Sequence, residues 1–346
     1  VTGGTGSGAG NAGSNFISIE DSLKSAGFNM NEKVANIYKS TTYTAPVSMG
    51  FMVSDTTVEA PVSILENAEG SFNFYGDAVI WTIGRVGGEG QDLLSYDVPT
   101  FEDETKHILE LDDNEREVLE YLEGLKSAGT INKIVVLVNS ANVMEMGPLE
   151  DSDYVDAILW IGQPGAAGLG GLGKVLTGEV SPSGRTVDIW NANHQNDPTW
   201  MNNGNPGQNG IDPDTGEEYT TTAYYKNAAG EYVAITGRPS RVGLEETGKV
   251  IEYEEGIYIG YKYYETAAAE GILTNEDIGY DKEEGTIPAL YEGDVYYNRS
   301  TGVIYPFGYG LSYTELSQEF VTTAEALETA INRKGGLGDK VTGQVK

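Results

Sequence analysis

Three apolar runs without helical spacing stand out in the first half of the chain. They cover residues 77–83, 133–139 and 155–161, and Val, Ile and Leu dominate them. Short runs of this kind, apolar on both faces, are typical of strands buried inside a parallel sheet. We therefore predict that the three runs lie adjacent or nearly adjacent in one mainly parallel sheet.

Helical segments precede and follow these runs, and one lies between the first two. Helices are predicted over residues 18–26, 31–39, 112–128 and 165–178, and a fourth strand over residues 186–190. The helix at 112–128 has the clearest pattern. Its apolar stripe is Val118, Leu119, Leu122 and Leu125, its first turn is acidic, and Gly129 follows it. Alternating strands and helices predict an α/β fold, a mostly parallel sheet with helices on both faces.

The second half of the chain has weaker periodicity. Residues 191–249 are rich in Asn, Gly, Thr and Tyr and indicate a loop-rich insertion. Its acidic group Asp212, Asp214 and Glu217 faintly resembles a calcium loop, but the spacing is incomplete and favours a polar turn. Residues 253–264 alternate after Gly256 and predict a strand.

Candidate chemistry follows the first apolar run. Glycines interrupt the chain there, and Arg85, Glu89 and Asp92 stand among them. In open α/β sheets, ligands bind beyond the carboxyl ends of the strands. Glu89 lies between two glycines, whose backbone can approach a ligand closely. The pattern predicts a ligand-binding loop, although an ordinary solvated turn has the same local appearance.

Charge and composition narrow the choice of partner. The chain of 346 residues has 21 basic and 53 acidic residues, a net charge of −32. This balance argues against nucleic acid or an anionic membrane as a partner and favours an uncharged or cationic ligand. Cysteine is absent, which excludes a thiol nucleophile, and two histidines are too few for a His-rich metal site.

A glycine motif supports a different function. Gly168, Gly170 and Gly173 form a G-x-G-x-x-G pattern after the third apolar run, and Asp188 lies near the offset expected for a ribose-binding acid. This is the case for a nucleotide-binding oxidoreductase domain. Pro164 delays the first glycine, however, and small residues also let a helix pack closely against a sheet. A non-catalytic carbohydrate-binding module is a further alternative.

Several segments together resemble glycoside hydrolase family 3. In the family's order, they are VIWTIGRVGGEGQD, KIVVLVNSANVMEM, VDAILWIGQPGAAGLGGLGKVLTGEVSPSGRT, YEEGIYIGYKYYET and YPFGYGLSYTE. The resemblance implies an α/β sandwich domain over residues 1–313 and, over residues 314–346, the beginning of a fibronectin type III-like β domain. The family's (β/α)8 barrel, which has the nucleophile, is not among the matched segments.

The resemblance also implies a reaction. The chain would be part of a retaining, exo-acting β-glycosidase of the β-glucosidase type. Glu89, in the family's Gly-Glu-Gly position, would be the general acid/base, facing a β-glycoside bound on the barrel. Arg85 and Asp92 would position the loop or bind substrate. Trp200 is the better sugar-stacking candidate, because Trp160 and Trp190 fall in predicted strands and are expected in the core. No cofactor and no metal are expected, and the pattern leaves the cellular compartment open.

Overall fold

The structure of the chain is a computed structural model that describes most of its first two thirds. The described residues are 16–40, 44–49, 52–57, 59–85, 106–191, 193–194, 197, 199, 209–211, 218–220, 223–226, 232–235, 256–269 and 303–314. The predictions for Glu89, Asp92, Trp200, the acidic group at 212–217 and the β domain after residue 314 lie outside these residues.

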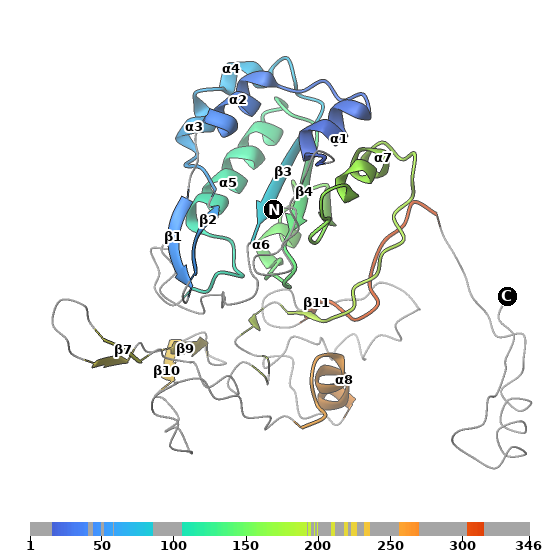
Figure 1. The fold of residues 1–346 in the computed structure, drawn as a ribbon. Coiled ribbons are helices and arrows are strands. Elements are labelled where there is room, and N and C mark those ends of the chain that lie inside the picture. The colour runs from blue at the N-terminus through green and yellow to red at the C-terminus, as the bar shows by residue number, and fades with distance from the viewer. Residues whose placement is uncertain are drawn as a thin grey trace, which may run out of the picture.

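Helices and strands alternate through the main part of the described fold (Figure 1). The helices are α1 (Ile19–Ser25), α2 (Glu32–Ser40), α3 (Ser63–Glu66), α4 (Glu69–Phe72), α5 (Asp113–Ser127), α6 (Gly147–Glu150), the 3-10 helix η2 (Gly168–Gly171), α7 (Leu172–Leu176) and α8 (Tyr261–Ala269). The strands are β1 (Thr44–Met49), β2 (Met52–Thr57), β3 (Val79–Gly84), β4 (Ile134–Asn139), β5 (Ala157–Trp160), β6 (Trp190–Asn191), β7 (Asn209–Ile211), β8 (Glu218–Thr220), β9 (Ala223–Lys226), β10 (Tyr232–Ile235) and β11 (Val303–Tyr305).

The three predicted strands form one parallel sheet in the order β3-β4-β5, with β4 in the centre. Val79 pairs with Ile134 at the start of β3, and Gly84 pairs with Asn139 at its end. The predicted adjacency and the mainly parallel α/β class are therefore confirmed. Because β3 and β4 end in register, the chain leaves both strands at the same edge of the sheet.

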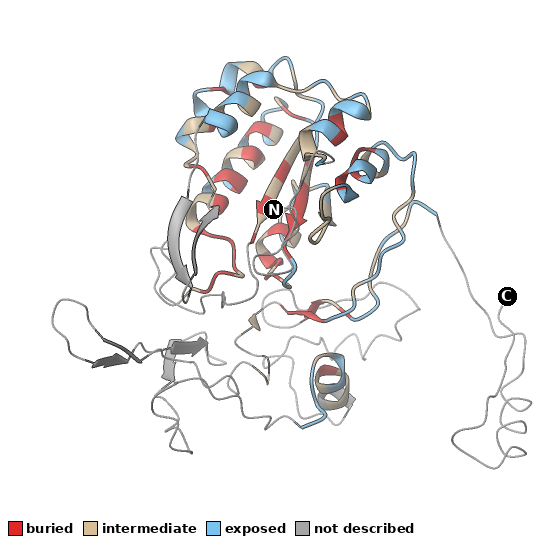
Figure 2. Cartoon of the chain, in the orientation of Figure 1, coloured by how far each residue is buried: buried red, intermediate tan, exposed pale blue. Residues whose placement is uncertain are grey.

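Burial of the central strand explains its continuous apolar run. Ile134, Val136 and Val138 pack with the apolar stripe of α5 in the larger core cluster. Leu137, from the alternate set of positions, packs with Leu169 and Leu172 in a second cluster. Both sets of β4 positions are therefore covered by other elements, and Figure 2 shows β4 and the inner side of α5 mainly in the colour of buried residues.

Helix α5 begins and ends as its sequence predicts. Asp112 is the N-cap, and its carboxylate accepts the Glu115 N–H, while Glu115 accepts the Asp112 N–H in return. Gly129 adopts a φ of 74°, a left-handed conformation that ends helices and that glycine adopts without steric cost. Ser18 and Asp21 form the same reciprocal cap on α1, as their spacing predicts.

The G-x-G-x-x-G motif lies where α7 packs against α1. A Cβ on Gly173 would lie 2.5 Å from the carbonyl oxygen of Ser22 and 2.6 Å from the Cβ of Ala26. The Gly173 N–H donates to the hydroxyl of Ser22 at 3.0 Å. The packing interpretation of the motif therefore holds, except that the close partner of Gly173 is helix α1 and not the sheet.

Replacing Gly173 by alanine should destabilise the fold by about 1–3 kcal/mol, because backbone must move to admit the methyl group. Gly124→Ala is the matched control, since Gly124 lies in α5 with open space around its Cβ position. It should stabilise the fold by about 0.5–1 kcal/mol through helix propensity. Urea unfolding measures both, and similar effects from the two substitutions would contradict the packing argument.

The predicted strand at 186–190 is wrong. Thr186 donates its N–H to the carbonyl of Tyr309 (2.7 Å) and accepts the N–H of Gly308 (2.8 Å). Only β6 at the end of the run is a strand, and it pairs antiparallel with β11, outside the main sheet. The segment finds its partners in residues far along the chain, which a local pattern cannot indicate.

The predicted strand at 253–264 is also wrong: among its described residues, 256–264, there is no strand, and α8 begins at Tyr261. The alternating aromatic residues suggested a strand, but the residues that follow, through the alanines at 267–269, favour helix. Tyr264 is buried, whereas Ile257 and Tyr258, which precede the helix, are exposed. The helix-favouring residues at the end of α8 therefore outweigh the alternating pattern at its start.

Regions without a clear sequence pattern contain short antiparallel pairs. β1 pairs with β2 before α3, and within the 191–249 region β7 pairs with β8 and β9 with β10.

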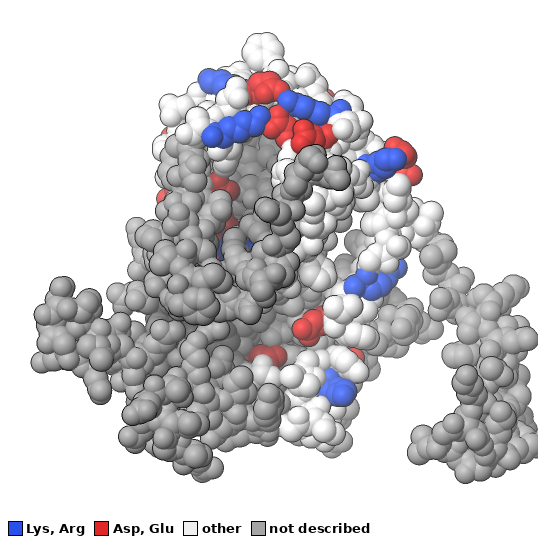
Figure 3. Space-filling model, viewed as in Figure 1, with Lys and Arg blue, Asp and Glu red and all other residues white. Residues whose placement is uncertain are grey.

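Over α1 and α2, at the top of Figure 3, basic and acidic side chains alternate, with Lys24 bound to Glu20 and Glu32. Among the parts of the chain that the structure describes, no helix combines the length and apolar character needed to cross a membrane.

Candidate active site

The candidate site begins where β3 and β4 end. The Arg85 N–H donates to the carbonyl of Asn139 at 3.2 Å, one residue beyond the paired strands. The segment 86–105, which contains Glu89 and Asp92, lies outside the described residues, which resume at Lys106. Of the predicted site residues, the structure therefore places Arg85, at the predicted edge of the sheet.

The Arg85 side chain is buried and uses every donor it has. Its Nη1 and Nη2 atoms bind the two carboxylate oxygens of Glu115 at 2.7 and 2.6 Å. The Nε atom donates to the carbonyl of Ile108 at 2.5 Å, Nη2 also to that of Glu110 at 2.6 Å, and Nη1 to that of Gly84 at 2.9 Å. These contacts occupy all five N–H donors of a guanidinium.

Arg85 therefore joins the two ends of the 86–105 segment. Its own backbone continues β3, and its guanidinium donates to the carbonyls of Ile108 and Glu110, which follow the segment in the sequence. Glu115, on α5, fixes the guanidinium with a bidentate ion pair. Because no donor remains for a sugar hydroxyl, this geometry favours the loop-positioning role over the substrate-binding role.

Burial lowers the pKa of Arg85, but the carboxylates of Glu115, Asp112 and Glu59 outweigh it and raise that pKa. Glu59 lies in the same network and accepts hydrogen bonds from Trp81 (2.8 Å), Ala60 (2.7 Å) and Tyr38 (2.9 Å). Burial and then the neighbouring Glu115 carboxylate raise the pKa of Asp112 to about 7. Burial also raises the pKa of Glu59, against the hydrogen bonds it accepts. The network therefore takes up a proton between weakly acidic and neutral pH.

Stability should depend on pH through Asp112. Its pKa is about 7 in the fold against an ordinary value of 3.8, so the folded chain holds the proton over that interval and the unfolded chain does not. Stability from this group is present below pH 4 and is lost as pH rises to 7. Asp112→Asn, which keeps an N-cap oxygen, should remove this loss, a gain on the order of a few kcal/mol at pH 7 and above.

Denaturant unfolding of both proteins between pH 4 and 8 measures this difference. The control is Glu117→Gln, which removes a charge from the exposed side of α5. A difference between wild type and Asp112→Asn that stays constant with pH would contradict the assignment.

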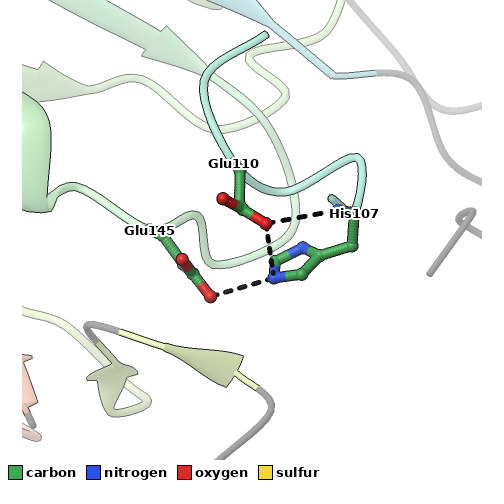
Figure 4. A group of neighbouring side chains, drawn as sticks. All are labelled: His107, Glu110 and Glu145. Atoms are coloured by element: carbon green, nitrogen blue, oxygen red, sulfur yellow. Dashed lines mark hydrogen bonds and ion pairs between the residues drawn. The ribbon is translucent and has the colours of Figure 1, made fainter. Parts of the chain in front are cut away.

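A second polar cluster consists of His107, Glu110 and Glu145, and two of these residues follow directly after the described chain resumes at Lys106 (Figure 4). The Nε2 atom of His107 lies 2.9 Å from a carboxylate oxygen of Glu145 and 3.7 Å from one of Glu110. The His194 N–H donates to the same Glu145 oxygen at 2.6 Å. Burial opposes a charge on His107, but the Glu145 carboxylate outweighs it and raises the pKa of the imidazole. For His194, burial dominates and lowers the pKa.

This cluster also has the donor atoms of a cation site. Single ligand atoms of His107, Glu110 and Glu145 all lie within 4.8 Å of one another, a nitrogen and oxygen set that suits Zn²⁺. However, Lys106 already pairs with Glu110 at 2.6 Å, as His107 pairs with Glu145. The Leu109 N–H donates to Nδ1 of His107 at 3.3 Å, so Nε2 carries the ring proton even in the neutral form. The geometry therefore supports an ion-pair cluster.

Sequence reasoning missed most of these polar residues. Glu115 belongs to the acidic first turn of the predicted helix 112–128, but nothing in the sequence marks it as the partner of Arg85. His107, Glu145 and Glu59 had no local signal, apart from the rarity of histidine in this chain. An acidic residue at helix position N3 after an Asp N-cap is a signal for capping only. The contacts of Arg85 and of Glu145 join residues that lie far apart in the sequence.

One of the two expected core tryptophans is not in the core. Trp190 is buried and packs edge-on against Trp160 and Tyr305. Trp160 is 38% exposed, so its predicted core placement is wrong. Its strand, β5, is the outer strand of the described sheet, and its indole N–H donates to the carbonyl of Ser140 at 2.7 Å. An edge position leaves one side of the indole uncovered.

Comparison with known proteins defines the class of this α/β chain. The model of the glycosyl hydrolase family 3 C-terminal domain matches residues 2–261, which include the sheet, Arg85 and the Gly-Glu-Gly segment. The chain is thus an α/β domain of a glycoside hydrolase type. It belongs to glycoside hydrolase family 3.

The relatives it matches include β-glucosidases by name. The chain is 27% identical to a beta-glucosidase of Ruminococcus albus over 99% of its own length and 26% of that protein. It is 24% identical to beta-glucosidase A of Butyrivibrio fibrisolvens over 69% of its length and 21% of that protein. The chain thus spans about a quarter of the length of these relatives.

Solved structures of β-glucosidases have the same fold. Beta-glucosidase 3B from Thermotoga neapolitana, in complex with glycerol, superposes on 92% of this chain and 33% of its own, with a TM-score of 0.54 and 23% identity. A beta-glucosidase from Paenibacillus barengoltzii also covers 92% of this chain and 26% of its own, with a TM-score of 0.54 and 21% identity. At these identities the likeness concerns the fold.

Proposed function

We propose that this chain supplies the general acid/base of a retaining, exo-acting β-glucosidase-type enzyme, and that Glu89 is this residue. The site would be shared with a (β/α)8 barrel that provides the nucleophile and binds the terminal β-linked sugar. The observation that supports the proposal is the set of hydrogen bonds from Arg85, which follows β3, to the carbonyls of Ile108 and Glu110; these residues flank the segment containing Glu89 in the sequence. Family membership supplies the reaction class.

The chemistry sets the requirements for Glu89. Retaining glycosidases use two carboxyl groups about 5–5.5 Å apart, one as nucleophile and one as acid and then base. The acid must be protonated before it donates to the leaving oxygen, and removal of water by barrel and sugar raises the pKa of such a glutamate. Arg85 uses its donors on protein acceptors and would contribute by positioning. Asp92 and Trp200 are proposed for loop positioning and for contact with the sugar.

The finer architecture is part of the same proposal. Residues 1–313 would form an α/β sandwich with helices on both faces of the sheet, and residues 314–346 would begin a fibronectin type III-like β domain. The packing of alternate β4 positions into two clusters supports the sandwich. The partners would be a β-glycoside or oligosaccharide and the barrel, whereas a net charge of −32 disfavours nucleic acid and anionic membranes.

Activity with and without the barrel tests the proposal. The purified chain alone should not hydrolyse aryl β-glucosides, because only one of the two required carboxyl groups is assigned within it. The chain together with its barrel should hydrolyse them. Turnover by the chain alone, abolished by substitution of Glu89, would require a nucleophile within these 346 residues. A complex that binds β-glycosides without turnover would instead favour a carbohydrate-binding module.

A further inference from the structure

Residues 107–110, just after the 86–105 segment, are held from two sides. Arg85 binds the carbonyls of Ile108 and Glu110. Glu145 binds the alternate residues: its backbone N–H donates to the carbonyl of Leu109 at 2.9 Å, and its carboxylate accepts from His107 at 2.9 Å. Alternate residues of this short stretch therefore face two separate anchors.

The two anchors come from different parts of the fold. Arg85 continues β3 and pairs with α5, whereas Glu145 follows the end of β4 on the chain that leads to α6. The same Glu145 oxygen that binds His107 also accepts the N–H of His194 at 2.6 Å. Glu145 thus joins three distant segments through one carboxylate oxygen, and its loss would leave the Arg85 clamp intact.

Hydrogen bonds to one carboxylate oxygen give the Glu145 anchor its geometry. The carboxylate is mostly buried, with 12% of the side chain exposed, and burial alone would favour its neutral form. The neighbouring His107 and the hydrogen bonds from His107 and His194 reverse that effect and lower the pKa of Glu145. Donors held in a fixed N–H···O geometry orient their residues more narrowly than apolar contacts do.

From this geometry we propose that Glu145, through His107, is a positioning residue that determines where the acid/base segment rejoins the fold, and so how Glu89 is presented to the leaving group. This inference rests on the proposed function of Glu89. A misplaced acid fails mainly when proton donation is needed, because small displacements of a catalytic group are costly. Loss of Glu145 should therefore affect substrates according to their leaving groups.

The experiment measures kcat/KM of the complete enzyme, chain and barrel together, for aryl β-glucosides with activated and with poor leaving groups. Glu145→Ala should lower the value for poor leaving groups by about 10–100-fold and that for activated ones far less. Glu145→Gln keeps an oxygen at the same reach and should restore most of the loss. The control Glu179→Ala removes an exposed carboxylate, 62% accessible, and should change neither value.

Two comparisons keep the test decisive. If Glu145→Ala does not fold, Glu145→Asp, which keeps the charge but is one methylene shorter, replaces it and should be worse than Glu145→Gln on poor leaving groups. Equal losses on both substrate classes, or no loss, would overturn the positioning role. Glu89→Ala separates the two claims. If its effect does not depend on the leaving group, the proposed function is overturned. If its effect does depend on the leaving group but the effects of the Glu145 variants do not, only this inference is overturned.

Discussion

Glu89→Ala in the complete enzyme should lower turnover of β-glucosides with poor leaving groups by about 10²–10⁴-fold, the usual contribution of a general acid. An activated aryl glycoside leaves with little help from an acid, so its glycosylation step should suffer far less. Hydrolysis of the glycosyl-enzyme would then become rate-limiting, because the attacking water has lost its base. Steady-state and burst kinetics with both substrate types measure these effects.

Azide gives the more specific signature. As an anionic nucleophile it needs no base, so it should restore turnover of the activated substrate by Glu89→Ala and form a β-glycosyl azide. Asp92→Ala is the matched variant, since Asp92 is the nearest other carboxylate in the same segment. If Asp92→Ala shows the rescue and Glu89→Ala leaves both substrates nearly untouched, Asp92 is the acid/base.

Arg85→Leu should destabilise the fold by about 3–5 kcal/mol, because it leaves the Glu115 carboxylate buried without its cation and removes a donor from three backbone carbonyls. Glu115→Gln should also destabilise strongly, although glutamine preserves the helix cap, because it strands a guanidinium that is 5% exposed. Arg85→Lys should not rescue the fold, since an ammonium cannot make the bidentate contact. Denaturant unfolding of the chain measures all three.

An exposed ion pair is the control for this prediction. Lys174 and Glu179 lie 3.0 Å apart with side chains 52% and 62% exposed. Lys174→Met should change stability by less than about 1 kcal/mol, as is usual for surface pairs. An Arg85→Leu effect of similar size would mean that the buried network contributes little, and the clamp could not then be the reason for the placement of the acid/base segment.

Patterns along the chain determined the framework of this protein. The apolar runs of β3, β4 and β5 need a covered sheet wherever they lie, and the stripe of α5 needs an apolar surface to face. The caps at Ser18 and Asp112 and the end of α5 at Gly129 depend on residues within one turn. The apolar patterns require burial wherever the segments lie, and the caps need only hydrogen bonds between residues close in the sequence. The position of Arg85 at the end of β3 followed from the same pattern.

The tertiary structure alone decided what the polar residues at this edge contact. Arg85 could have faced a ligand, and its five donors instead meet acceptors on residues 84, 108, 110 and 115. Glu145 meets His107 and His194, residues that no local pattern connects. The same holds for β6, which pairs with β11. A polar group must find a partner when it is buried, and which partner it finds depends on the carbonyls and charges that distant segments bring beside it.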